Sequence, residues 1–139
     1  MTSDGSSWHP ILNVTDNLKT IDVVDRSNLC DQLSALKKEC EKSLAHRVLA
    51  VKEQGCFLVL LDIYDKLCTV GDDASMTVLL STWCALLNGQ PDCVYDRVAD
   101  IFMDLTKSKV KNICLFGVRL IITSCIMHEG NRQSFIGKY

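Results

Sequence analysis

The stretch that decides the fold is Met76–Tyr95, MTVLLSTWCALLNGQPDCVY. Its apolar side chains recur at spacings of three and four residues, as on one face of an α-helix: Met76, Leu79, Leu80, Trp83 and Leu87. The pattern ends at Asn88-Gly89, a pair that commonly ends helices, and Pro91 has a φ suited to the first turn of a new helix. The stretch therefore predicts one helix, a sharp break and a second helix.

The same pattern returns 41 residues later, where Gly89 maps onto Gly130 and Cys84 onto Cys125. A second pair of segments also matches in sequence, and in this match Arg47 aligns with Arg132. An internal period near 40 residues is typical of helical repeat proteins, which favours binding over catalysis. The last partial repeat stops where another glycine is expected, so we expect a truncated array with an uncovered C-terminal face.

Apolar stripes at helical spacing predict seven helices, over residues 11–21, 29–40, 44–51, 57–68, 75–88, 94–105 and 110–128. Asp25 or Ser27 can cap the second helix, and an aspartate after Gly71 can cap the fifth. No alternating strand pattern competes with these stripes. We therefore predict an all-α domain over residues 11–139, preceded by a disordered segment over residues 1–10.

Composition excludes several classes of protein. A net charge of −2 over 139 residues gives no electrostatic reason to expect binding to nucleic acid or to a membrane surface. Arg119 interrupts the most apolar region, so no uncharged apolar run is long enough for a transmembrane helix. No signal peptide is visible either, so we expect an intracellular, cytoplasmic protein that could also enter the nucleus. The eight cysteines contain no C-x-x-C pair, which indicates reduced thiols.

Candidate catalytic and metal-binding residues are few. Cys125 and His128 have the i, i+3 spacing of two ligands on one helix, but no second pair completes a metal site. Cys93, in the first turn after Pro91, is the candidate nucleophile by position, and a partly exposed helical cysteine is the simpler interpretation. We therefore expect no enzyme activity, no metal and no cofactor, with a thiol sensor or enzyme as a distant alternative.

Three peptides carry a family resemblance: AHRVLAVKEQG (Ala45–Gly55), LNGQPD (Leu87–Asp92) and HEGNRQ (His128–Gln133). With the cycle of short, medium and long helices, they resemble the armadillo repeat family over about Leu29–Tyr139. The resemblance implies a right-handed α-solenoid of about two to three repeats, whose third helices line a groove that binds a protein partner.

The resemblance also has a departure. In peptide-binding family members the groove helix often carries W-A-L-x-N, whose asparagine clamps the backbone of the ligand. This chain keeps Ala85-Leu86-Leu87-Asn88, but Cys84 replaces the tryptophan, and Trp83 lies one position early. That departure argues against binding of extended basic peptides. We expect Trp83 to pack in the core, with stacking on a ligand as the alternative.

The candidate groove residues are Ser81, Asn88, Arg119 and Glu129. Arg119 is a cation inside an apolar helix, so its side chain must either pair with a carboxylate or face the groove. Pairing with a carboxylate of the neighbouring repeat is the favoured alternative. The leading hypothesis is a protein-interaction module, and the alternative is an N-terminal capping or scaffold segment without a ligand. We also expect the isolated chain to self-associate through its uncovered C-terminal face.

Overall fold

The structure is a computed structural model that describes residues 3–52, 55–89, 96–125 and 129–138; within these, the side chains of 3–9, 96, 129, 134, 135, 137 and 138 are not described. The described residues form α-helices joined by short connections and contain no strand. The helices are α1 (Ser3–Lys19), α2 (Arg26–Lys42), α3 (Leu44–Lys52), α4 (Cys56–Val70), α5 (Asp73–Leu87), α6 (Asp96–Leu105), α7 (Lys111–Cys125) and α8 (Glu129–Lys138). The all-α prediction is confirmed.

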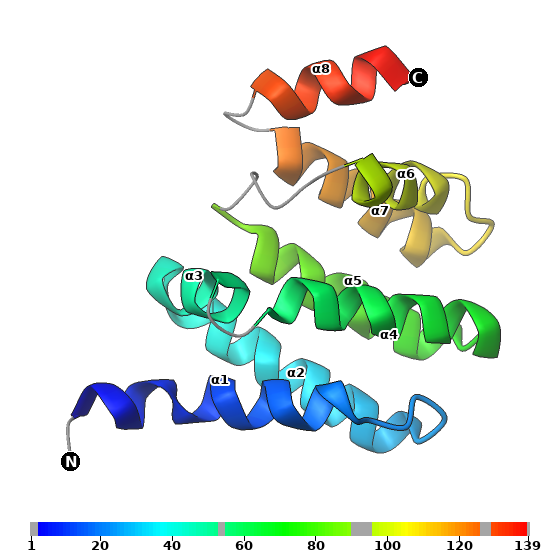
Figure 1. Ribbon diagram of the computed structural model, residues 1–139. Helices are drawn as coiled ribbons and strands as arrows, with labels where there is room; N and C mark the ends of the chain where they lie inside the picture. The colour runs from blue at the N-terminus through cyan, green and yellow to red at the C-terminus, as the bar shows by residue number, and fades with distance from the viewer. Residues whose placement is uncertain (1–2, 53–54, 90–95, 126–128, 139) are drawn as a thin grey trace.

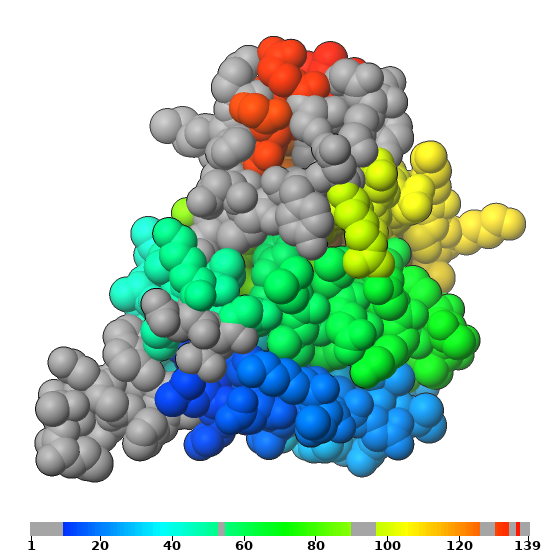
Figure 2. Space-filling model, viewed as in Figure 1, coloured from blue at the N-terminus to red at the C-terminus, as the bar shows by residue number. Residues whose placement is uncertain are grey.

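The helices stack in layers along one direction, from α1 at one end to α8 at the other (Figure 1). Three long helices pack in sequence through this stack, since α2 contacts α5 and α5 contacts α7. The space-filling view shows the blue, green and yellow layers directly against one another (Figure 2). The two termini lie at opposite ends, as expected for a solenoid in which each layer packs on its neighbours.

Helix ends largely follow the predicted capping residues. The Asp25 carboxylate accepts from the Asn28 amide at 3.3 Å, and the Asp72 carboxylate accepts from the Ser75 amide at 3.3 Å. Gly89 has a φ of +80°, the left-handed conformation expected after α5. Gly130 differs from this expectation, because it is the second residue of α8 rather than a residue that ends a helix.

The N-terminal segment also differs from the expectation. Of residues 1–10, which were expected to be disordered, residues 3–10 belong to α1, which includes Pro10, and residues 1 and 2 lie outside the described residues. The buried side chains of Ile11, Val14 and Leu18 anchor the helix on the core. Once such a turn is fixed, each further residue gains one hydrogen bond for the two dihedral angles that it orders, so helical structure can extend beyond the apolar stripe.

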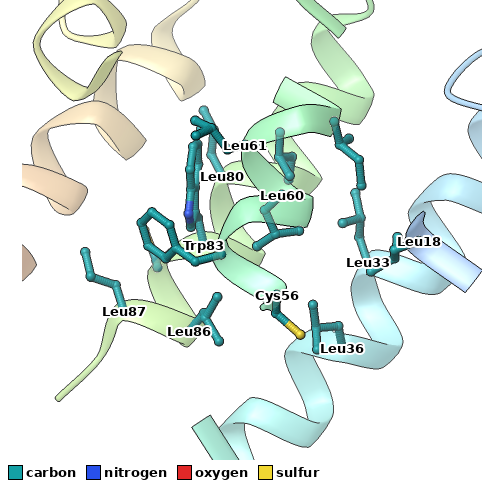
Figure 3. Packing of buried hydrophobic residues seen from close by; sticks show 14 of the residues in the cluster. Leu18, Leu33, Leu36, Cys56, Leu60, Leu61, Leu80, Trp83, Leu86 and Leu87 are labelled. Carbon is teal, nitrogen blue, oxygen red and sulfur yellow. The ribbon is translucent and has the colours of Figure 1, made fainter. Parts of the chain in front are cut away.

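An aromatic cluster around Trp83 joins α4, α5 and α6. The Trp83 ring is fully buried, and its centroid lies 5.4 Å from that of Phe57, 6.0 Å from that of Tyr64 and 5.7 Å from that of Phe102. Figure 3 shows Leu61 and Leu80 beside the same ring. The prediction that Trp83 packs in the core is confirmed.

Candidate protein-binding groove

A polar hollow of about 550 Å³ crosses the long helices α2, α5 and α7. Two residues come from α2, one from α3, two from α7 and the others from α5 and its C-terminal cap: Lys37, Glu41, Arg47, Ser81, Cys84, Ala85, Asn88, Arg119 and Thr123. The hollow therefore spans successive layers of the stack, and a segment lying in it would touch several helices at once.

The floor of the hollow comes from one face of α5. Ser81, Cys84, Ala85 and Asn88 recur at spacings of three and four residues, so they share that face. Three of these side chains are small, which leaves room above the helix. The structure thus brings together three of the candidate groove residues, Ser81, Asn88 and Arg119. The side chain of the fourth, Glu129, lies outside the described residues.

Arg47 ties two of the groove helices together at their C-terminal ends. Its Nη1 donates to the backbone oxygen of Cys40 at 2.9 Å, and its Nε donates to the backbone oxygen of Asn88 at 2.8 Å. The last carbonyl groups of a helix lack partners within that helix, and a cation satisfies both their hydrogen bonding and their partial charge. Arg132 repeats half of this arrangement, because its Nη1 donates to the Cys125 oxygen at 3.0 Å.

Arg119 faces the hollow instead of pairing with an acid of the neighbouring repeat. Its guanidinium carbon lies 5.6 Å from the centroid of the Phe116 ring, one turn earlier on α7. No ion pair joins Arg119 to any side chain that the structure describes. The structure favours the groove-facing alternative because the aromatic ring of its own helix supports the cation beside solvent.

The hollow carries more positive than negative charge. Lys37, Arg47 and Arg119 line it with one acid, Glu41, although the whole chain has a net charge of −2. Burial raises the pKa of the Cys84 thiol to about 11, and the positive charges of Arg119 and Lys37 oppose that rise. The charges of both cations therefore act on the same point of the floor, the Cys84 thiol. Because its pKa is raised, this thiol stays protonated at neutral pH and is a poor nucleophile.

The sequence-based candidates for metal binding and catalysis lie partly outside the described residues. The described residues hold no group of three histidine, cysteine or acidic side chains placed to bind a metal ion. Cys93 and His128 lie outside the described residues. Within the described part of the chain, no helix has the length and apolar character needed to cross a membrane.

Sequence reasoning missed Lys37, Glu41, Arg47 and Thr123 as lining residues. Of these, Arg47 had a signal, since its match to Arg132 marked it as part of the repeat. Lys37 and Glu41 lie one helical turn apart on α2, a spacing that any solvated face can show. Which face of α2 borders α5 depends on how the layers stack, and a single helical stripe does not fix that.

Comparison with known proteins gives relatives from one group. The chain is 30% identical over 135 residues to the Armadillo repeat-containing protein 6 homolog of Drosophila melanogaster, which covers 91% of the chain. It is 26% identical over 141 residues to Armadillo repeat-containing protein 6 of Homo sapiens, covering 98% of the chain, and equally to that of Pongo abelii. The chain is therefore similar over nearly its whole length to armadillo repeat proteins, and its all-helical fold agrees with that similarity.

The chain spans about 29% of the length of the Drosophila relative and 28% of the human one. No family model matches the chain, and no solved structure matches it. The helices α2, α5 and α7, which supply most of the residues that line the hollow, pack successively against one another.

Proposed function

We propose that this chain is a non-enzymatic module that binds a segment of a protein partner in the groove along α2, α5 and α7. The observation that carries the proposal is the polar hollow across three long helices that pack successively against one another. Concave, extended surfaces of this kind are how solenoid proteins bind their partners. The relatives named as armadillo repeat proteins support the same class of function.

The binding mode differs from a ladder of tryptophan and asparagine side chains. Trp83 is buried against Phe57, Tyr64 and Phe102, and Cys84 stands on the groove face instead. Asn88 remains at the groove, where its backbone oxygen already accepts from Arg47. A ligand would therefore meet hydroxyl, amide and charged groups rather than an indole ring.

An affinity pull-down with the full chain tests this proposal. We compare Arg119→Glu with Lys107→Glu, an exposed charge reversal in the turn between α6 and α7. Proteins that bind the groove should be lost with Arg119→Glu and kept with Lys107→Glu. A set of captured proteins that is the same for both variants would contradict groove binding.

A capping or scaffold role is the second candidate, and a specific surface favours it. Leu115, Val118 and Ile122 are 51%, 41% and 53% exposed on α7, and Ile136 is 72% exposed on α8. Exposed apolar side chains that lie close together promote association with another repeat or a second copy of the chain. We therefore propose, as in the sequence analysis, that the isolated chain self-associates through this face.

Sedimentation by analytical ultracentrifugation at micromolar concentration tests that second role. The chain should sediment above its monomer mass, and Leu115→Ser/Ile122→Ser should restore the monomer. A monodisperse monomer for the unaltered chain would rule out self-association through α7.

We also propose an intracellular location, which rests on the eight cysteines and the absence of C-x-x-C pairs.

A further inference from the structure

We propose that the groove selects an acidic segment, whose carboxylates lie between Lys37 of α2 and Arg119 of α7 while its backbone crosses the small side chains of α5. This inference rests on the proposed function, since it names the chemistry of the segment that the groove binds. Its basis is the arrangement of charge across the hollow, which the sequence analysis did not foresee.

The two cations stand on opposite walls of the hollow. Lys37 belongs to α2, Arg119 belongs to α7, and α5 lies between them, packed against both helices. The influence of both cations on the Cys84 thiol puts them within electrostatic reach of one point on the floor. An anionic side chain above that point would be attracted from both sides.

The fold makes little use of these two cations. Among the described side chains, no ion pair is formed by Lys37 or by Arg119. Arg47 is different, because its hydrogen bonds to the ends of α2 and α5 give it a structural role. Lys37 and Arg119 thus remain available to a ligand, and Arg119 is held in place by the Phe116 ring.

The floor between the cations suits a peptide backbone. Ser81 and Ala85 are half-buried and small, and Cys84 contributes a neutral thiol. Side chains of this size let a chain lie close to α5, while hydroxyl and amide groups of Ser81 and Asn88 can form hydrogen bonds with it. A bulky basic side chain would instead meet like charges on both walls.

Charge balance favours a short acidic segment over a nucleic acid. The hollow is lined by three cations and one acid, but the whole chain carries −2. A long polyanion would be repelled by the acidic remainder of the surface, whereas a few carboxylates experience mainly the local field. The structure therefore points to a protein ligand rather than to DNA or RNA.

Selection of short random peptides displayed on phage, against the immobilised full chain, tests the proposal. The key variant is Lys37→Glu/Arg119→Glu, and the matched control is Lys38→Glu/Lys107→Glu, which changes the net charge equally at two exposed lysines. Peptides selected on the unaltered chain and on the control should be enriched in Asp and Glu, and those selected on the key variant should not be.

The selected peptides then serve as the probes for affinity. Reversal of both cations should weaken binding roughly tenfold or more, because opposite charges that attract become like charges that repel. Binding to the unaltered chain should also weaken with added salt. Urea unfolding checks that the variants fold, and Lys37→Gln/Arg119→Gln should show an intermediate loss.

Failure of this inference can be separated from failure of the proposed function with Ser81→Trp, which fills the groove. Basic or uncharged peptides whose binding is lost with Ser81→Trp would overturn the acidic segment but keep the groove as a binding site. If no peptide is enriched, or if Ser81→Trp has no effect, both proposals are wrong. A labelled poly(dT) oligonucleotide that binds more tightly than every peptide, and depends on Lys37 and Arg119, would replace the protein segment with nucleic acid.

Discussion

The helices α5 and α7 have the same length and related sequences, but they are buried to different extents. Each has 15 residues, and the 41-residue period maps Leu79 of α5 onto Leu120 of α7. Nine residues of α5 are buried and four of α7, although α7 carries apolar side chains on nearly every face. The difference follows from neighbours: α5 packs between α2 and α7, whereas the described helices cover less of α7. In a stacked fold, an apolar stripe marks a potential interface, and the adjoining layer decides whether it is buried.

The largest expected effect comes from comparing one aromatic residue of α5 with one leucine of α7. Trp83→Ala should lower the free energy of unfolding by about 3–5 kcal/mol, because it leaves a cavity among Phe57, Tyr64 and Phe102. Leu115→Ala should cost under about 1 kcal/mol, because Leu115 is 51% exposed. Urea unfolding of both variants is the measurement, and equal losses would mean that α7 is as well covered as α5.

Gly117 of α7 gives the next largest effect, because α7 lies very close to the C-terminal end of α6 at this residue, whereas α5 has no glycine at the matching position. A Cβ at Gly117 would lie 2.8 Å from the Leu105 Cβ and 2.9 Å from the Thr106 amide nitrogen, whereas the period puts Met76 at the matching position of α5. Gly117→Ala should therefore destabilise the chain by about 1–3 kcal/mol, against the gain that alanine usually brings inside a helix. Thermal unfolding measures this, and a rise in melting temperature would show that α6 and α7 do not approach so closely.

How far the sequence predicts this fold depends on whether a feature is local. The sequence predicts Asp25 or Ser27 as one cap and an aspartate after Gly71 as another, because a cap depends on a few neighbouring residues. The structure shows Asp25 and Asp72 in these positions. The place of Trp83 in one apolar stripe predicts that it packs in the core. Ser81 and Asn88 are candidate groove residues from the repeat and the resemblance, and Arg119 is one because it is a cation inside an apolar helix. Lys37 and Thr123 were missed because their positions in the groove depend on the offset between stacked helices. The prediction that Gly130 ends a helix is wrong, because a single glycine can stand in the first turn of a helix as well as at its end.

The N-terminal cap of α5 should respond to pH. Hydrogen bonds from Arg26 and then from Ser75 lower the pKa of Asp72 to about 2, from an ordinary value of 3.8. A lowered pKa in the folded state means that the stabilisation is present above about pH 4 and is lost as the pH falls toward 2. The first turn of α7 contains no acidic residue, so its N-terminus lacks this dependence.

Asp72→Asn tests this difference, since asparagine keeps an oxygen acceptor but loses the charge. The variant should be less stable at pH 7, and its stability should fall less than that of the unaltered chain between pH 4 and pH 2. Urea unfolding over that range is the measurement. Parallel curves for the two proteins would show that the pairing of Asp72 with Arg26 does not contribute to folding.

The smallest effect concerns the reactivity of exposed and buried cysteine thiols. Cys68 is exposed on α4, whereas burial raises the pKa of Cys84 on α5 to about 11 and that of Cys40 on α2 to about 12. Cys68 should react first with a disulfide reagent at neutral pH, and Cys40 and Cys84 should react only as the chain unfolds. Rapid reaction of Cys84 in the folded chain would revive the thiol-sensor alternative.

Site-specific photo-crosslinking tests the groove most directly. A photoreactive amino acid is placed at Ser81, on the groove floor, or at Leu58, which is 63% exposed on α4 and does not line the hollow. Both chains are incubated with proteins captured by the unaltered chain and then irradiated. Groove binding predicts crosslinked partner from position 81 and little from position 58. Crosslinking from position 58 and none from position 81 would contradict it.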